Sequence, residues 1–359
     1  MLRPDPYTGP PPAPVQRSTD QHASVEALLR GEPLLVSDFY STGLSLLAAL
    51  RIALKSPGES FAEQREFRQR YHAASSNLLA PIRDHRLALR KAPAIGWFSE
   101  MYEDLPSFEL PFPQIQGLNS SWQWYRKGLR LPVIQRRLHP LHGTYFPTRH
   151  EHLHLFSRWL RRYAGARDRA IDVGTGCGVL ALQLHAAGFT DIVATDINAN
   201  AVEGLRRDLE REPPITSIET RKTWMIGPVG SRFDLIVFNP PWLPGEPKGL
   251  LDQAIYYPPR LFDDFFAAAW RALRPEGRLV LLFSNLLQVI STNGEGGKAA
   301  HSSKHPIVRE LKRRKRFEKV RLLERPVGAA SKKTRRRKRT NTDERVQLWE
   351  LRRRSGGGA

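Results

Sequence analysis

The second half of the chain alternates between short apolar runs and longer segments in which apolar residues recur at helical spacing. Strand, helix, strand order repeated in this way needs crossover connections, which bury a parallel sheet between two helix layers. The pattern therefore predicts a doubly wound α/β domain. Its strand candidates span residues 169–174, 191–196, 215–220, 233–239, 278–284, 317–324 and 345–352.

The first 140 residues have a different pattern. Residues 1–22 hold six prolines and little that could pack, so we expect a disordered tail. Residues 23–92 show helical spacing, whereas aromatic residues and prolines crowd together over 93–148, which favours irregular structure and short strands over long helices. The predicted organisation is a Pro-rich tail (1–22), a mainly helical and irregular N-terminal region that could recognise substrate (23–140), the α/β domain (141–354) and a flexible end (355–359).

Composition narrows the setting in which the protein works. No apolar run approaches the ~18 to 20 residues that cross a bilayer, and the first residues contain no apolar signal segment, so we expect no membrane association. The single cysteine, Cys177, excludes disulfides within the chain. A reducing, intracellular and therefore cytoplasmic location follows as the expectation.

The positive charge is concentrated near the end of the chain. The net charge is +20, and residues 298–359 alone hold 22 Lys or Arg against 6 Asp or Glu, an excess of 16. Such asymmetry favours a polyanionic partner, and a solvated basic segment without a partner is the alternative. The densest run is KKTRRRKR, which contains Lys332, Lys333, Arg335, Arg336, Arg337, Lys338 and Arg339.

The first strand of the α/β domain ends in a glycine-rich turn. The stretch IDVGTGCG (171–178) places Asp172 ahead of Gly174, Gly176 and Gly178, just before a helical segment. Glycine allows positive φ and a close approach of the backbone to a ligand. A tight strand-to-helix turn explains the stretch equally well by itself, and its G-x-G-x-G spacing differs from the G-x-G-x-x-G of dinucleotide binders.

Two later strands also end in polar residues that could contact the same ligand. The second strand ends with Asp196, twenty residues after Gly176, where an acidic side chain can accept both hydroxyls of a ribose or can cap the following helix. The fourth strand ends FNPPW, where Pro240 and Pro241 fix the exit of the chain after Asn239. The three elements together predict one ligand site at the carboxyl edge of the sheet.

From about 142 to 285 the chain resembles the class I S-adenosylmethionine-dependent methyltransferases, in the subgroup whose fourth strand ends [Asn/Asp]-Pro-Pro-[Tyr/Phe/Trp]. That subgroup methylates nitrogen on planar groups, either exocyclic amines of nucleic-acid bases or the side-chain amide of release-factor glutamine. The resemblance implies a Rossmann-like seven-stranded methyltransferase sheet and S-adenosylmethionine as cofactor. It further implies that the cofactor lies against Asp172, Gly174, Thr175, Gly176, Cys177 and Gly178, with Asp196 and Ile197 at its ribose.

The segment ahead of the first strand, HGTYFPTRHEH (142–152), is similar to the lid of that family. The similarity implies that Phe146, Pro147, Thr148 and Arg149 line the cofactor entrance. One position departs from the family, which has an Asp near the end of the third strand for the adenine amine. This chain has ETRKTW (219–224) there, so Trp224 or a backbone group is expected to replace the acid.

The FNPPW stretch suggests how transfer would proceed. A planar nitrogen is a poor nucleophile because its lone pair is delocalised. The Asn239 side-chain oxygen and the Pro240 carbonyl can accept its two N–H groups and stabilise the positive charge that develops. Pro240 and Pro241 would hold these acceptors rigidly, and Trp242 would stack on the target plane. A simple strand-ending turn is the alternative.

Two other patterns have competing interpretations. Five histidines lie between residues 139 and 154: His139, His142, His150, His152 and His154. If a helix runs through the last three, His150 and His154 share a face at i, i+4 spacing, which a metal could use, but no cysteine lies near them. We therefore expect no metal and interpret the histidines as polar surface residues near the lid. The stretch GLNSSWQWYRKG (117–128) interleaves aromatic and basic residues as base-stacking surfaces do, and packing of Trp122 and Trp124 is the favoured explanation.

The last two strands of such a sheet form a hairpin, whose connection emerges at the carboxyl edge. Residues 326–344 would then project a basic loop beside Asn239. The leading hypothesis is an N-methyltransferase acting on a nucleic-acid base, with structured RNA favoured over DNA. The main alternative is a protein methyltransferase acting on a glutamine amide. Small-molecule methylation and a non-enzymatic RNA-binding scaffold are further alternatives, although the intact motifs argue against the scaffold.

Overall fold

The computed structural model describes residues 1–54, 61–211, 213–228, 232–247, 249, 252–286, 305–328 and 344–354. The chain divides into two compact units, Met1–Arg126 and Lys127–Ala359. The predicted boundary at residue 140 is therefore too late. Residues 127–140 belong to the second unit because Leu129, Leu131 and Leu138 are buried in its core. None of the helices in the described ranges is long and apolar enough to cross a membrane.

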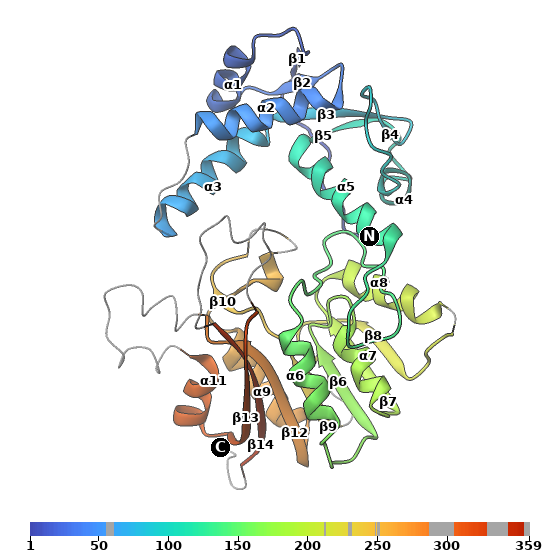
Figure 1. Ribbon diagram of the computed structural model, residues 1–359, viewed down its shortest axis with the longest axis vertical. Coiled ribbons are helices and arrows are strands. Elements are labelled where there is room, and N and C mark those ends of the chain that lie inside the picture. Colours follow the sequence, from blue (N-terminus) through green and yellow to red (C-terminus); the bar gives the residue numbers. More distant parts are fainter. Residues whose placement is uncertain are drawn as a thin grey trace. The chain divides into compact units, whose positions relative to one another are not determined.

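The first unit is an α/β unit with a sheet of its own, whereas the sequence predicted a mainly helical region. Five strands form the order β1-β2-β3-β4, with β5 also paired to β3 (Figure 1). Strands β1, β2 and β3 are parallel, and β4 and β5 run antiparallel to β3. The elements are β1 (Ala13–Val15), α1 (Gln21–Arg30), β2 (Leu34–Val36), α2 (Tyr40–Ala53), α3 (Phe61–Ser75), β3 (Leu78–Arg83), β4 (Arg86–Leu87), α4 (Trp97–Met101), β5 (Phe108–Pro111) and α5 (Phe112–Lys127).

The prediction of a disordered tail over residues 1–22 is wrong. Residues 13–15 form the outer strand of the sheet, where Pro14 is tolerated because an edge strand leaves amides unpaired. Ahead of it, Arg3 forms an ion pair with Asp104 at 2.6 Å, and the Tyr102 hydroxyl donates to the Pro4 carbonyl at 2.6 Å. The prolines therefore belong to an ordered extended segment that docks on its own unit.

Helix α5 corrects the expectation of irregular structure over residues 93–148. Its buried residues Phe112, Ile115 and Leu118 recur every three positions, which is a helical face. Pro113 stands in the first turn, where no amide donor is needed, so it does not break the helix. In this segment Trp122 packs against Trp97 with ring centroids 5.0 Å apart, while Trp124 is exposed.

The second unit has the predicted doubly wound architecture. Its seven strands follow the order β13-β14-β12-β9-β6-β7-β8, and all are parallel except β14. Two short strands, β10 and β11, pair in a separate ribbon after β9. The elements are α6 (Glu151–Leu160), β6 (Arg169–Val173), α7 (Val179–Ala186), β7 (Asp191–Asp196), α8 (Ala199–Glu210), β8 (Ile218–Lys222), β9 (Phe233–Phe238), β10 (Leu243–Pro244), η1 (Asp252–Ala254), β11 (Tyr256–Tyr257), α9 (Leu261–Ala272), β12 (Leu273–Ser284), α11 (Pro306–Arg309), the π-turn η3 (Glu310–Arg314), β13 (Phe317–Pro326) and β14 (Arg345–Arg353).

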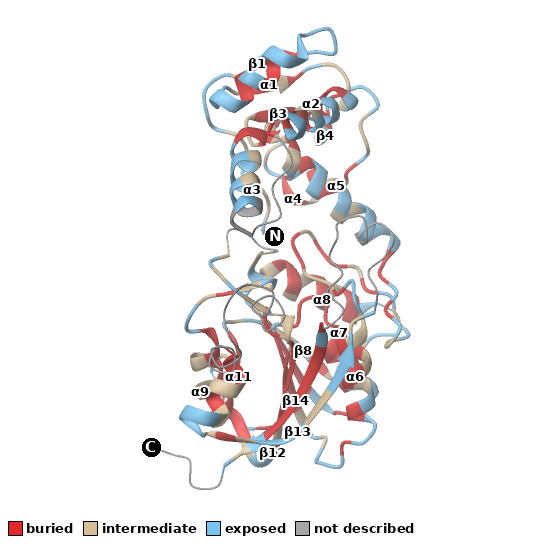
Figure 2. Cartoon of the chain, turned by 60° about the vertical axis from the view of Figure 1, so that its left-hand side comes forward, coloured by how far each residue is buried: buried red, intermediate tan, exposed pale blue. Residues whose placement is uncertain are grey.

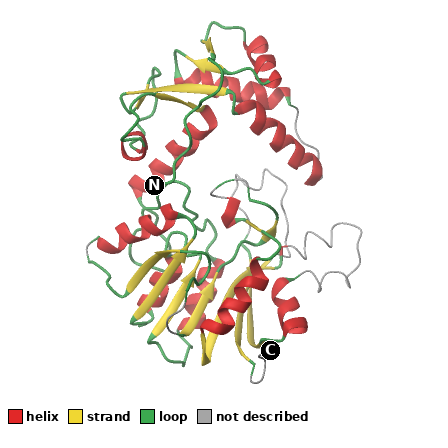
Figure 3. Cartoon of the chain, turned by 180° about the vertical axis from the view of Figure 1, so that it is seen from behind, coloured by secondary structure: helices red, strands yellow, loops and turns green. Residues whose placement is uncertain are grey.

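Each face of this sheet has its own apolar core. Alternate residues of one strand point to opposite faces, so Leu235 and Val237 of β9 join the core under α6, α7 and α8. The neighbouring residues Ile236 and Phe238 join the core under α9 and α11. Figures 1 and 3 show the helices on the two faces, and Figure 2 shows the central strands as largely buried, β9 along its whole length. Burial on both faces explains the continuous apolar runs in the sequence.

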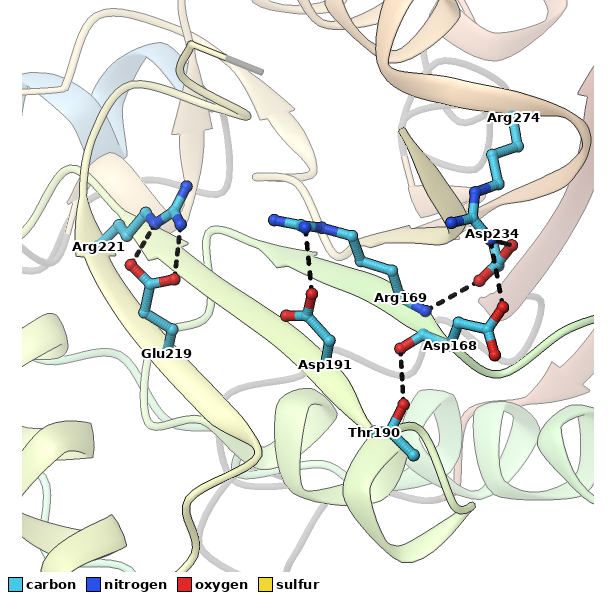
Figure 4. A network of polar contacts seen from close by, with 8 residues as sticks. All are labelled: Asp168, Arg169, Thr190, Asp191, Glu219, Arg221, Asp234 and Arg274. Atoms are coloured by element: carbon cyan, nitrogen blue, oxygen red, sulfur yellow. Dashed lines mark hydrogen bonds and ion pairs between the residues drawn. The ribbon is translucent and has the colours of Figure 1, made fainter. Parts of the chain in front are cut away.

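A network of polar contacts fixes the amino end of the sheet (Figure 4). Asp234 at the start of β9 accepts from the Arg274 side chain at 2.6 Å and from the Arg169 amide at 2.8 Å. The Arg169 side chain in turn pairs with Asp191 at the start of β7, at 3.1 Å. The network ties β6, β7, β9 and β12 together at this end, and the glycine-rich turn lies at the opposite, carboxyl end of the strands.

Candidate active site

A cavity lies where β6, β7, β8 and β9 end, and we call it the carboxyl-end cavity. Its walls come from the glycine loop after β6, the residues that follow β7 and β8, and the Asn239 motif after β9. The segment ahead of α6 and the turn η1 complete it. The cavity thus joins the three sequence elements that predicted a ligand site.

The glycine loop adopts a backbone that other residues rarely reach. Gly174, Gly176 and Gly178 have φ of 63°, 53° and 86°. At Gly176 a Cβ atom would lie 3.0 Å from the Tyr145 carbonyl oxygen, so glycine is also needed for close packing of the loop against the segment ahead of α6. Gly174, Thr175, Gly176 and Cys177 line the carboxyl-end cavity, and Gly178 caps the start of α7.

Asp172 lies behind this loop instead of lining the cavity. One carboxylate oxygen accepts from the Thr175 hydroxyl at 2.7 Å and from the Ala181 amide at 3.0 Å, which joins the loop to α7. The other oxygen has no hydrogen-bond partner within the described part of the chain. Complete burial raises the pKa of Asp172 to about 7. The carboxyl group therefore supports the loop that forms the cavity wall.

Asp196 is at the end of β7 and lines the cavity directly. Its two oxygens accept from the amides of Gly176 and Asn198, each at 2.9 Å. Each oxygen retains a second lone pair for a hydroxyl group. Burial raises the pKa of this carboxyl group. The helix-cap alternative does not hold, because α8 is capped by Asn198, whose side chain accepts from the Asn200 amide at 2.9 Å.

The residues after β8 form the wall where the sequence lacks the expected acid. Thr223, Trp224 and Met225 line the cavity. Trp224 is 48% exposed, an unusual position for an indole that packs only within the chain. The Met225 carbonyl accepts from the buried Thr195 hydroxyl at 2.7 Å, which fixes the turn to β7.

The lid segment contributes different residues from those the family similarity implied. Of the four named positions, only Pro147 lines the carboxyl-end cavity. Phe146 packs against the core under α6, Thr148 is exposed, and Arg149 pairs with Glu344 at 2.9 Å. Gly143 and Tyr145 line the cavity, although the family similarity did not imply them. Gly143 lies in a turn with a φ of 72°, so the path of the segment past the cavity could not be deduced from strand periodicity.

Two asparagine side chains anchor this lid segment. The Asn198 side chain donates to the Gly143 carbonyl at 2.8 Å, and that of Asn200 donates to the His142 carbonyl at 2.8 Å. Both asparagines are buried at the start of α8. No local motif predicts these two contacts, because the partners lie more than 50 residues away.

Asn239 and Pro241 line the cavity at the end of β9. The Trp242 indole donates to the Asn239 side-chain oxygen at 3.2 Å. That oxygen is the predicted acceptor of a substrate N–H, and one of its two lone pairs remains for such a bond. Trp242 and Pro240 do not line the cavity, and the indole is partly buried against the cores on both faces of the sheet. The structure thus brings the Trp242 indole to the Asn239 side chain, whereas the FNPPW motif predicted a surface that stacks on the substrate.

His152 is a cavity residue that the sequence analysis placed at the surface. It is 2% exposed, and its ring lies edge to face with the Trp242 ring, with centroids 5.8 Å apart. His154, on the same helix, is half-buried and does not line the cavity. Within the described residues, no group of three or more His, Cys, Asp and Glu side chains could hold a metal ion.

The base of the basic hairpin lies beside the lid. Strand β13 runs parallel to β12 and is followed by the antiparallel β14, so their connection leaves at the carboxyl edge, as predicted. The Gly328 amide donates to the Glu151 carboxylate at 2.9 Å, and Glu344 pairs with Arg149. The basic run itself, from Lys332 to Arg339, lies outside the described residues.

A second hollow on this unit carries positive charge. It is lined by Leu131, Pro132, Ile134, Gln135 and the basic residues Arg130, Arg136, Arg137 and His150, and we call it the cationic hollow. No acidic side chain lines it. His150 directly precedes α6, whose second residue, His152, lines the carboxyl-end cavity. The two hollows therefore flank the start of the same helix.

The residues of the carboxyl-end cavity fit the nucleoside part of the cofactor that the family resemblance implies. Asp196 offers carboxylate lone pairs suited to a ribose diol. Trp224, Met225 and Phe238 offer apolar surface suited to a base. Gly176 leaves room that a Cβ atom would fill, and the unpartnered oxygen of Asp172 is a buried acceptor behind the loop.

Comparison with known proteins agrees with this geometry. Residues 154–293 match the family model described as Methyltransferase small domain. The release factor glutamine methyltransferase of Deinococcus radiodurans is 32% identical over 151 residues, which cover 41% of this chain and 49% of that protein. The tRNA1(Val) (adenine(37)-N6)-methyltransferase of Aeromonas salmonicida is 32% identical over 120 residues, 32% of this chain and 50% of that protein.

Among solved structures, a ribosomal protein L11 methylase from Lactobacillus delbrueckii subsp. bulgaricus is 20% identical with a TM-score of 0.38. The comparison covers 63% of this chain and 91% of that one. The chain spans about half the length of the two sequence relatives. The matched family region contains the glycine loop, Asp196 and Asn239. Residues 154–293 of this chain are therefore similar to a methyltransferase small domain.

Proposed function

We propose that the protein is an S-adenosylmethionine-dependent N-methyltransferase whose acceptor is an exocyclic amine of a nucleic-acid base, with RNA favoured. The observation that carries the proposal is the Asn239 amide oxygen. It lies in the wall of a cavity whose other walls suit the cofactor, and the Trp242 indole holds it at 3.2 Å. An oriented acceptor at that position is what a planar amine needs.

The cofactor would lie against the glycine loop, with Asp196 at its ribose and Trp224 and Met225 at its base. When bound, it supplies an electrophilic methyl group on a sulfonium. The remaining catalytic work belongs to the chain and consists mainly of positioning. The lid segment, anchored through Asn198 and Asn200, would help to exclude water from this site.

Asn239 would act on the acceptor. Its side-chain oxygen has a free lone pair in addition to the one that the indole uses, so it can accept an N–H of the amine. The Pro240 carbonyl, the second acceptor predicted from the sequence, belongs to a residue that does not line the cavity, so the proposal rests on Asn239. The bond to Asn239 grows stronger as positive charge develops on the nitrogen, so it stabilises the transition state more than the bound substrate.

Two features of charge support a nucleic-acid acceptor. The cationic hollow offers Arg130, Arg137 and His150 beside the start of α6, next to the carboxyl-end cavity. The hairpin that carries the basic run 332–339 is anchored at Glu151 and Arg149, on the same edge of the sheet. Phosphate groups provide the complementary charge along an extended ligand.

A protein glutamine amide is the second candidate. The similarity to a release factor glutamine methyltransferase favours it, because a glutamine amide and an aryl amine present the same planar NH₂ group to Asn239. The cationic hollow and the basic run are the features that the amide alternative leaves unused.

Transfer of a tritiated methyl group distinguishes the two. The full chain is incubated with labelled S-adenosylmethionine and, separately, with total RNA and with total protein freed of nucleic acid. We expect label in RNA, whereas label in protein alone would favour the glutamine amide. Wild-type enzyme that labels neither fraction would overturn the proposed acceptors.

The Asn239→Ala variant is the matched control for this experiment. We expect the rate to fall by about 10² to 10³, the loss typical of one preorganised polar group at a developing charge. Affinity for S-adenosylhomocysteine, measured by calorimetry, should stay within about twofold, because Asn239 is assigned to the acceptor. Unchanged turnover in this variant would remove Asn239 from the mechanism.

A further inference from the structure

His152 is a buried polar residue in the wall of the carboxyl-end cavity. It is the second residue of α6, it is 2% exposed, and it lines the cavity. Neither ring nitrogen has a hydrogen-bond partner within the described part of the chain. Buried polar side chains nearly always have such a partner, and leaving one unpaired destabilises the folded state. A buried imidazole of this kind in a cavity wall indicates that a ligand provides the missing partner.

The surroundings of His152 indicate which ligand that is. Its ring lies edge to face against Trp242, whose indole holds the side chain of Asn239. The three side chains form a continuous chain of contacts on the acceptor side of the cavity. The walls assigned to the cofactor, Asp196 and Thr223 to Met225, follow β7 and β8 at the other side.

We propose that His152 binds the methyl-accepting substrate directly. Its ring N–H would donate a hydrogen bond to the substrate atom that accepts hydrogen bonds beside the methylated nitrogen. This inference rests on the proposed function. In the exocyclic amines of adenine and cytosine that atom is a ring nitrogen, and in a glutamine amide it is the carbonyl oxygen. His152 and Asn239 would then hold the two edges of one planar group, the first as donor and the second as acceptor.

The protonation state of His152 suits this role. Burial lowers the pKa of His152 to about 4, so the ring is neutral at physiological pH. A neutral imidazole carries one N–H donor and one acceptor nitrogen. It can therefore donate to the substrate without bringing a positive charge close to the sulfonium of the cofactor, which a protonated ring would repel.

Two substitutions of His152 separate hydrogen bonding from packing. His152→Phe keeps an aromatic ring against Trp242 and removes both polar atoms, whereas His152→Gln restores an N–H donor of similar reach. His154→Phe is the matched control, because His154 is on the same helix but does not line the cavity. Each variant is assayed by tritiated-methyl transfer to the fraction, total RNA or total protein, that the wild-type chain labels.

We expect His152→Phe to raise KM for the acceptor by about tenfold, the order of one buried hydrogen bond, and His152→Gln to recover part of that loss. His154→Phe should behave as wild type. Calorimetry with S-adenosylhomocysteine should give dissociation constants within about twofold for all the proteins, which also shows that each is folded.

Two outcomes would overturn the inference. Wild-type KM and kcat in His152→Phe would show that the ring only packs. A tenfold loss of S-adenosylhomocysteine affinity in both His152 variants would assign the residue to the cofactor. Failure of the proposed function is a separate result, since the wild-type chain would then label neither fraction.

Discussion

At the scale of single residues, Trp242 is where the structure changes the chemical hypothesis most. The sequence suggested an indole plate that stacks on the substrate. In the structure the ring is partly buried, and its N–H donates to the Asn239 oxygen at 3.2 Å. The indole is therefore a positioning residue that selects one orientation of the Asn239 amide, because a donor at that position requires an oxygen opposite it.

This role can be separated from stacking by Trp242→Phe. Phenylalanine keeps an aromatic ring but loses the N–H, so the Asn239 amide can rotate. We expect kcat to fall by about tenfold, which corresponds to about 1.4 kcal/mol in the barrier, with little change in S-adenosylhomocysteine affinity. Single-turnover methyl transfer measures this step. A Phe variant that reacts as fast as the wild type would show that the ring acts as an apolar surface alone.

At the scale of elements, the lid segment depends on α8. The side chains of Asn198 and Asn200 reach back to the carbonyls of Gly143 and His142, each at 2.8 Å, and thereby hold Tyr145 and Pro147 in the cavity wall. Asn200→Ala leaves the His142 carbonyl without this donor. We expect about a tenfold weaker affinity for S-adenosylhomocysteine, measured by calorimetry, because the cofactor must then also order the lid.

Glu203→Ala is a matched control on the same helix. Glu203 pairs with Arg206 and Arg207 on the outer side of α8, and exposed ion pairs contribute little to stability. This variant should bind S-adenosylhomocysteine as the wild type does. Equal losses in Asn200→Ala and Glu203→Ala would mean that α8 as a whole, and not the lid contact, sets cofactor affinity.

The length and burial of each element explain whether it could be predicted from the sequence. The strands of the second unit were found because runs such as β9 are buried on both faces and so are apolar apart from Asp234 near the strand's start. The sheet of the first unit was missed because β1 and β2 are three residues long, too short for a period to be recognised. Local motifs singled out Gly176, Asp196 and Asn239, which line the cavity and whose roles stay predictions. His152 and Asn198 were not singled out, because their contacts are with residues distant in sequence.

At the scale of the whole molecule, charge is the feature that distinguishes the two candidate acceptors. The chain carries a net charge of +20, and the described part includes the cationic hollow at the start of α6. Within that hollow, Arg136 and Arg137 donate hydrogen bonds to backbone carbonyls and so stabilise the fold. Arg130 is exposed, and no ion pair to it is found in the described residues. It is the residue whose charge can be removed with least effect on the fold.

A salt titration of RNA binding therefore tests whether the cationic hollow contacts phosphate groups. If Arg130 contacts a phosphate, Arg130→Gln should weaken binding of a single-stranded RNA oligonucleotide at low salt. It should also reduce the slope of log K against log salt by about 1, or slightly less for a single strand.

Arg162→Gln is the matched control. It removes the same charge from an exposed position after α6, towards the amino end of the sheet, and should retain the wild-type slope. Fluorescence anisotropy from 50 to 300 mM salt, roughly the range in which phosphate contacts are lost, measures both slopes. Equal slopes in the two variants would show that the positive charge acts only as a diffuse field, and the cationic hollow would then no longer favour RNA over a glutamine amide.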